Sequence, residues 1–92
     1  MDFSQITGDL FIGTMPSYMH YDVLRGLGVR LVINTRYSRG PEADRHDAPI
    51  KLLWLPMIDS PFFPLPLDKL MQGTRAALDT IHRGGKVYVH CA

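Results

Sequence analysis

Blocks of apolar residues along the chain predict short strands separated by helices. Ile6–Gly13 is expected to form two short strands around a Gly-Asp turn, because a Gly-Asp pair between β-forming residues suits a tight hairpin. The runs Arg30–Asn34 and Ile50–Met57 are too short for helices and are typical of buried strands. Pro56 confines the second run to a sheet edge or ends it, and Lys86–Cys91 is again rich in β-formers.

Two further segments show helical spacing. The first follows Ser17, a residue type that caps helix N-termini, and stops at Gly26 and Gly28. The second carries Asp68 in its first turn and stops at Gly84. One face of the first helix is expected to hold Met19, Val23, Leu24 and Leu27, and one face of the second Leu70, Thr74, Ala77, Leu78 and Ile81.

The order of these elements predicts the fold class. A strand-helix-strand crossover packs back onto its own sheet, which makes Lys86–His90 the central parallel strand, between the Arg30–Asn34 strand and the hairpin. Thr35–Pro49 has no apolar periodicity and Asp59–Pro66 holds three prolines, so both are expected to be loops. The sequence therefore predicts an α/β fold with a mostly parallel central sheet, an N-terminal antiparallel hairpin and flanking helices.

Composition narrows the class of protein. The chain has 92 residues, 46% of them apolar, which fits a single domain over residues 1–92. Ten basic and nine acidic residues give a net charge of +1 without a basic block, so nothing points to nucleic acid or to a membrane surface. The N-terminus lacks the pattern of a secretory signal and no apolar stretch has membrane-spanning length, from which we expect a cytoplasmic protein.

The single cysteine, Cys91, stands where a nucleophile would be useful. It cannot form an internal disulfide, and it follows the predicted central strand at its carboxyl end, where open α/β sheets bind ligands. Backbone N–H groups of a following loop and helix N-terminus would both favour the thiolate and cradle a phosphate. The alternative is a small buried cysteine without chemistry.

Several segments together resemble the dual-specificity protein phosphatases over nearly the whole chain. They are Leu10–Gly13, Leu27–Asn34, Asp59 in its loop and Val87–Cys91, in that order. The resemblance implies a His-Cys-x-x-Gly-x-x-Arg loop, of which these 92 residues supply His90, Cys91 and Ala92. The chain is thus expected to be the front part of a phosphatase-like domain and to be inactive by itself.

The resemblance also implies roles for particular residues. Cys91 would attack phosphorus, and Asp59, 32 residues earlier, would protonate the leaving oxygen and then activate water. His90 and Ala92 belong to the phosphate-binding loop, and Arg36 is a candidate for facing the anionic substrate. The expected partner is a phosphorylated protein or a small phosphomonoester, without a cofactor. Asp59 could instead be a turn residue before Pro61, and Arg36 a solvated arginine.

Other interpretations remain open at this stage. A rhodanese-type sulfurtransferase also carries a cysteine at a strand end, but its reaction would leave Asp59 without a catalytic role. A pseudophosphatase that binds phosphate groups without hydrolysing them differs only in the sequence of the catalytic loop. The acidic and histidine residues of 44–47 are crowded into one loop, so no metal site is expected, and Phe62 and Phe63 either wall the active site or pack beneath it.

The family's helices that follow the catalytic loop cover one face of its sheet. Without them we expect that face to be bare and the isolated chain to associate or to be marginally stable. Val32, Trp54, Leu55, Val87 and Val89 are candidates for this face, but their apolar runs lack the alternation that would show to which side each points.

Overall fold

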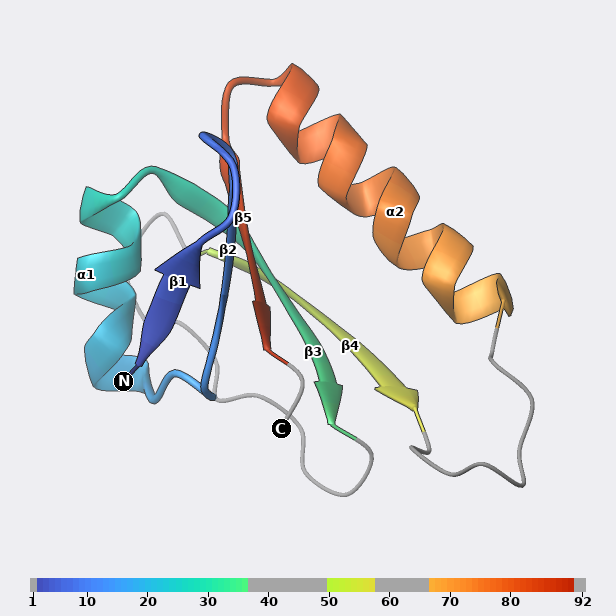
Figure 1. Ribbon diagram of the computed structural model, residues 1–92, viewed down its shortest axis with the longest axis horizontal. Coiled ribbons are helices and arrows are strands. Elements are labelled where there is room, and N and C mark those ends of the chain that lie inside the picture. Colours follow the sequence, from blue (N-terminus) through green and yellow to red (C-terminus); the bar gives the residue numbers. More distant parts are fainter. Residues whose placement is uncertain (1, 37–49, 58–66, 91–92) are drawn as a thin grey trace.

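One five-stranded sheet lies between two helices in the computed structural model, which describes residues 2–36, 50–57 and 67–90 (Figure 1). The strand order is β1-β2-β5-β3-β4, and only the β1–β2 pair is antiparallel. This arrangement confirms the predicted α/β class, the N-terminal hairpin and the central position of the last strand. The elements are β1 (Phe3–Gln5), β2 (Leu10–Gly13), the 3₁₀ turn η1 (Tyr18–His20), α1 (Tyr21–Gly26), β3 (Val29–Arg36), β4 (Lys51–Met57), α2 (Leu67–His82) and β5 (Lys86–His90).

The hairpin forms, but its first strand begins earlier than the sequence predicts. β1 starts at Phe3, and residues 6–9 make the turn, with the Ile6 N–H donating to the Leu10 carbonyl at 2.8 Å. The Phe3 ring packs edge-on against Phe11 and Tyr88, with ring centroids 5.8 and 6.3 Å away. Aromatic contacts of this kind stabilise cross-strand pairs, so they favour pairing at Phe3 over pairing within the Gly-Asp segment.

The first helix also differs from the prediction in which side chains it buries. Ser17 opens the 3₁₀ turn η1, where its carbonyl accepts the His20 N–H at 2.9 Å, and α1 itself starts only at Tyr21. A 3₁₀ turn has three residues per turn, so α-helical spacing counted through Met19 points to the wrong face. Leu24 is fully buried and Leu27 packs against the core as predicted, but Met19 and Val23 are 66% and 51% exposed and Tyr21 is buried in their place.

Successive side chains along the strands point to opposite faces of the sheet and build a separate hydrophobic core on each face. β3 contributes to both cores, because it is covered by α1 on one side and by α2 on the other. The α1-side core consists of Phe11, Tyr21, Leu24, Val29, Val32, Ile50 and Tyr88. The α2-side core consists of Leu31, Ile33, Leu55 and Val87, with Ala76, Ala77, Ile81 and Val89 packed against it.

Helix α2 confirms the predicted second helix and approaches the sheet closely through Gly73. A Cβ built on this buried glycine would lie 3.0 Å from Leu55 Cδ1, so the small residue sets the distance between helix and strand. Gly84, with φ +85°, ends the segment in the left-handed conformation that glycine adopts readily. Among the described residues, no helix is long and apolar enough to cross a membrane.

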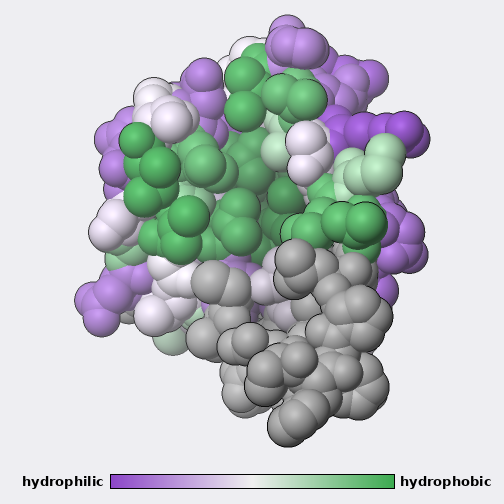
Figure 2. All heavy atoms as spheres, turned by 45° about the vertical axis from the view of Figure 1, so that its right-hand side comes forward, coloured by the Kyte–Doolittle hydropathy of each residue, from purple (hydrophilic) through white to green (hydrophobic). Residues whose placement is uncertain are grey.

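An apolar surface remains exposed between β2 and α2, but it is not the surface expected from the sequence. Of the five candidates, Val89 lies on this surface, whereas Val32, Leu55 and Val87 are buried and Trp54 is 46% exposed on the edge strand β4. Helix α2 packs on β3, β4 and β5 and leaves β2 uncovered. The resulting β2–α2 face, green in Figure 2, consists of Leu10, Ile12, Val89, Leu67, Leu70, Met71 and Leu78.

We expect the 92-residue chain to self-associate through the β2–α2 face, since exposed apolar patches of several side chains drive association. Leu78→Glu, at a position 49% exposed, should shift the chain toward monomer in sedimentation velocity without lowering its stability. Val23→Glu, 51% exposed on α1, is the matched control and should leave association unchanged. A wild-type chain that stays monomeric at high concentration would contradict this expectation.

Candidate active site

The four parallel strands bring their carboxyl ends to one edge of the sheet (Figure 1). β2 ends at Gly13, β3 at Arg36, β4 at Met57 and β5 at His90. This is the edge at which open α/β sheets bind ligands, and it is the edge predicted from the sequence.

The described residues cover only part of the predicted site. His90 is the last residue of β5 and is fully buried, and the backbone of Arg36 closes β3 after a register shift in its pairing with β4. Such irregularities are frequent beside active sites. Cys91, Ala92 and Asp59 lie outside the described residues, so their roles stay predictions.

His90 sits between two residues that the sequence analysis did not single out. It pairs in register with Gly13 of β2 and with Asn34 of β3, and Asn34 is fully buried as well. The Thr35 hydroxyl donates to the His90 carbonyl at 3.3 Å. The end of β5 is therefore held from both neighbouring strands at His90.

A tyrosine braces the same strand end against the hairpin. The Tyr88 hydroxyl donates to the Thr14 carbonyl at 2.6 Å, and its ring belongs to the α1-side core. Burial raises the pKa of Tyr88 to about 12, although the hydrogen bond to Thr14 acts in the opposite direction. Gly13 leaves no room for a side chain, because a Cβ there would meet the Tyr88 hydroxyl and the Asp2 carbonyl.

The raised pKa of Tyr88 gives a pH dependence that can be measured. Its protonated form is favoured in the folded state, so its contribution to stability is complete below pH 10 and is lost as pH rises toward 12. We expect that loss to be about 3 kcal/mol at most, since each pKa unit corresponds to about 1.4 kcal/mol. Tyr88→Phe should cost about 1 kcal/mol at neutral pH through the lost hydrogen bond.

Denaturant titrations of both proteins from pH 8 to 12 test this expectation. The stability difference between wild type and Tyr88→Phe should shrink above pH 10, because only the wild type loses the contribution of this hydroxyl. A difference that stays constant to pH 12 would show that Tyr88 titrates normally.

An apolar hollow of about 210 Å³ opens beside the His90 edge. It lies between the first half of α2 and the ends of β3 and β5, and it continues the β2–α2 face. Ile33, Thr35, Leu70, Thr74 and Val89 are among the residues that line it. The hollow gives the candidate site one apolar wall, with the Thr35 hydroxyl at its border.

Gly13, Asn34, Thr35 and Tyr88 hold the end of β5 in place, and the sequence analysis did not single them out. Asn34 carried a signal in the sequence, because an amide at the end of the apolar run Arg30–Asn34 is costly to bury without a polar partner. Gly13 and Tyr88 act through contacts between segments 75 residues apart in the chain, for which the sequence carries no local signal. In the described part of the chain, no group of three or more His, Cys, Asp and Glu residues is arranged to hold a metal ion.

Known proteins resemble the chain in structure rather than in sequence. The sequence matches no protein-family model and no curated protein. A mouse protein solved with zinc tungstate as a candidate dual specificity phosphatase matches with a TM-score of 0.80 and 24% identity, covering 97% of this chain and 54% of that one. Human DUSP28 matches with a TM-score of 0.76 and 24% identity, covering 97% of this chain and 57% of that one.

A bacterial structure extends the comparison to a substrate complex. A cysteine-to-serine variant of P. aeruginosa TpbA, solved in complex with pTyr, matches with a TM-score of 0.64 and 21% identity, covering 97% of this chain and 52% of that one. The chain thus has the fold of the dual-specificity and tyrosine phosphatases, as its sequence segments predict. It spans little more than half the length of the solved chains it matches.

Proposed function

We propose that these 92 residues form the front part of a cysteine-dependent phosphatase domain. The observation that carries the proposal is the placement of His90, fully buried at the end of the central strand and directly before Cys91, in a phosphatase fold. Cys91 directly follows the carboxyl end of β5 in the sequence, and ligands bind at the carboxyl ends of the strands in such sheets.

In the proposed reaction, the Cys91 thiolate attacks phosphorus, so that an S–P bond forms while the P–O bond of the ester breaks. The Asp59 carboxyl group gives its proton to the leaving oxygen. In the second step Asp59 takes a proton from water, the water oxygen attacks phosphorus, and the S–P bond breaks to release phosphate and thiolate. His90 and the backbone at Ala92 would orient the loop, and Arg36 would face the anionic substrate.

The proposed substrates are phosphomonoesters, on tyrosine, serine or threonine of a protein or on a small molecule. The pTyr bound to the TpbA variant supports a phosphotyrosine group in this fold. The alternative, a pseudophosphatase, would bind the same groups without turnover, and it is distinguished by the loop residues after Ala92.

The proposal is tested by comparing two polypeptides on an aryl phosphate. The 92-residue chain should show no turnover, because its sequence contains neither the Gly nor the Arg of the loop that would stabilise the transition state. In an extended chain, a phosphatase segment with that Gly, that Arg and the following helix continues from Ala92 and should restore hydrolysis.

Within the extended chain, Asp59→Asn should lower kcat/KM by about 10²- to 10⁴-fold and remove the alkaline limb of its pH profile, because the Asp59 carboxyl group must be protonated to donate to the leaving oxygen. Asp68→Asn, at the start of α2, is the matched control and should leave turnover nearly unchanged. Equal activity of wild type and Asp59→Asn at every pH would remove Asp59 from the mechanism. Phosphate binding without turnover by the folded extended chain would favour the pseudophosphatase.

A further inference from the structure

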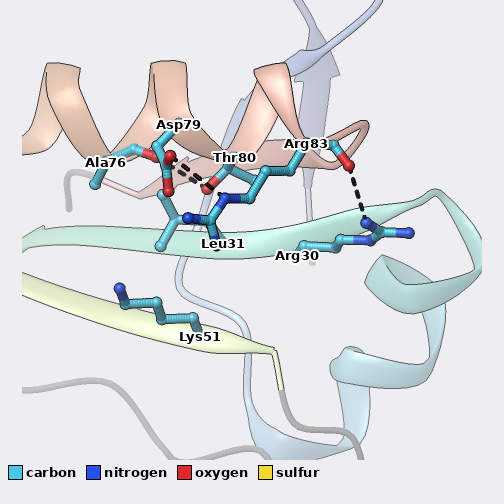
Figure 3. A pocket seen from close by; sticks show the side chains of 7 residues that line it. All are labelled: Arg30, Leu31, Lys51, Ala76, Asp79, Thr80 and Arg83. Atoms are coloured by element: carbon cyan, nitrogen blue, oxygen red, sulfur yellow. Dashed lines mark hydrogen bonds and ion pairs between the residues drawn. The ribbon is translucent and has the colours of Figure 1, made fainter.

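A second cavity, with a polar lining, lies at the opposite end of the sheet from His90 (Figure 3). It has a volume of about 310 Å³ and opens between the amino ends of β3 and β4 and the last turns of α2. Arg30 precedes Asn34 by four residues on β3, so the cavity is about 13 Å along the strand from the candidate active site. Arg30, Lys51, Asp79, Thr80 and Arg83 supply its polar lining, and we call it the basic pocket.

Three cationic side chains from three segments of the chain line the basic pocket, with the Arg30 guanidinium group turned away from Lys51 and from the Arg83 guanidinium group (Figure 3). Arg30 comes from β3, Lys51 from β4 and Arg83 from the residue after α2, whereas Asp79 is the single carboxylate. Arg83 Nε lies 3.4 Å from Asp79 Oδ1, with both side chains more than half exposed. An exposed pair of this kind contributes little, so it competes weakly with an incoming anion. The pocket has a formal charge of +2.

The strand side of the pocket is held in place by close packing. A Cβ built on Gly85 would lie 2.8 Å from Arg30 Cδ, so the Arg30 stem lies directly against the Gly85 backbone. Arg30 Nη1 donates to the Arg83 carbonyl at 3.3 Å, which ties the strand to the end of α2. Within the described residues, Lys51 makes no ion pair, and its ammonium group is therefore available to a ligand.

The floor of the basic pocket is apolar. Leu31 is buried beneath it and Ala76 lines its α2 side, while the Thr80 hydroxyl is turned back to donate to the Ala76 carbonyl at 2.9 Å. Figure 3 shows Arg83 reaching back over Leu31, with Lys51 on the neighbouring strand. The cavity thus joins a cationic rim to an apolar base, and its volume is at the lower end of the range for small-molecule sites.

We propose that the basic pocket binds a small organic phosphate, with its dianionic group between Arg83 and Lys51 and its apolar body on Leu31 and Ala76, while Arg30 adds positive charge at the rim. A dianion neutralises the formal charge of the lining, and guanidinium groups suit the paired oxygens of a phosphate. The site is separate from the proposed catalytic edge and does not depend on chemistry at Cys91.

A titration of the ¹⁵N-labelled 92-residue chain with phenylphosphonate, which cannot be hydrolysed as an ester, tests the proposal. Amide shifts should move at Arg30, Leu31, Thr80 and Arg83, with a Kd of about 1 mM. Inorganic phosphate should bind several times more weakly because it lacks the apolar body. Binding should weaken as salt is added, since the charges are exposed.

Variants on the pocket rim distinguish binding in the basic pocket from nonspecific attraction of an anion to the positive charges of the chain. Lys51→Gln and Arg83→Gln should each weaken binding about fivefold, whereas Asp79→Asn should strengthen it by a similar factor. Arg75→Gln, an exposed cation on α2 outside the pocket, is the matched control and should change nothing. The gain expected from Asp79→Asn cannot be produced by loss of folding.

Three results would overturn the proposal. One is the absence of shifts around Arg30 and Arg83 at high phenylphosphonate concentration in a chain whose spectrum shows it to be folded. Another is an unchanged affinity in Lys51→Gln, Arg83→Gln and Asp79→Asn. The third is equal affinity for inorganic phosphate and phenylphosphonate, which would mean that the apolar floor does not bind the phenyl ring. Shifts at His90 concern the catalytic edge and bear only on the proposed phosphatase.

Discussion

Cys91→Ser is expected to abolish hydrolysis of an aryl phosphate by the extended chain, by on the order of 10⁴-fold or more. Serine keeps the size of the side chain but has no thiolate near neutral pH, so the first S–P bond cannot form at a useful rate. Phosphate binding should survive, because the groups that hold the oxygens are unchanged. Steady-state kinetics and a phosphate titration measure the two effects separately.

A control distinguishes loss of the nucleophile from damage to the loop. Cys91→Ser should retain the melting temperature and the amide shifts of His90 seen in the wild-type extended chain. If the serine variant keeps a substantial share of the activity, the nucleophile is another group and the proposed mechanism is wrong.

Gly13→Ala is expected to destabilise the chain by about 3 kcal/mol and to lower its melting temperature by roughly 15 °C. The added Cβ would lie 2.5 Å from both the Asp2 carbonyl oxygen and Phe3 Cβ, and it would also meet the Tyr88 hydroxyl. Neither the paired backbone of β1 nor the buried ring can move away without loss of other contacts. Because Gly13 pairs with His90, the strand end that leads to Cys91 should shift as well.

Gly8→Ala is the matched control in the same hairpin. A Cβ at Gly8 meets nothing within 4 Å, and its φ is not in the left-handed region, so the change should stay within about 0.5 kcal/mol. Thermal unfolding of both variants decides the matter. Equal melting temperatures would show that the hairpin yields and that Gly13 does not fix the edge of the site.

The sequence was sufficient to predict the parallel core. Arg30–Asn34 and Lys86–His90 are short apolar runs on either side of a well-marked helix, and the handedness and packing of crossovers leave few ways to arrange them. Pro56 marked β4 as an edge strand, which is its observed position. In this part of the chain, the residue patterns of the single segments and the rules for connecting strands predict the same sheet.

Predictions failed where contacts between distant segments overrode local spacing. The start of β1 is set by the packing of Phe3 on Phe11 and Tyr88, and the buried face of α1 is set by the preceding 3₁₀ turn. Leu55 and Val87 are covered by α2, so they are not part of a bare face. None of these three effects is visible in the periodicity of a single segment.

The position of His90 at the end of the central strand was predictable, but the residues that hold it there were not. Asn34 and Thr35 contact His90 from β3, and Tyr88 ties the same strand to Thr14 of the hairpin segment. The basic pocket was also not predicted, because Arg30, Lys51 and Arg83 are isolated in sequence and line one cavity only through the pairing of β3 with β4 and the packing of α2 on the sheet.

The most direct test of the proposed phosphatase is the detection of a phosphocysteine. In the extended chain, Asp59→Asn should slow hydrolysis of the intermediate, so that rapid acid quenching after mixing with an aryl phosphate traps it. Mass spectrometry of the digested protein should then find one phosphoryl group on the peptide that contains Cys91, and none after Cys91→Ser. Turnover of substrate without any phosphoryl group on Cys91 would contradict the account.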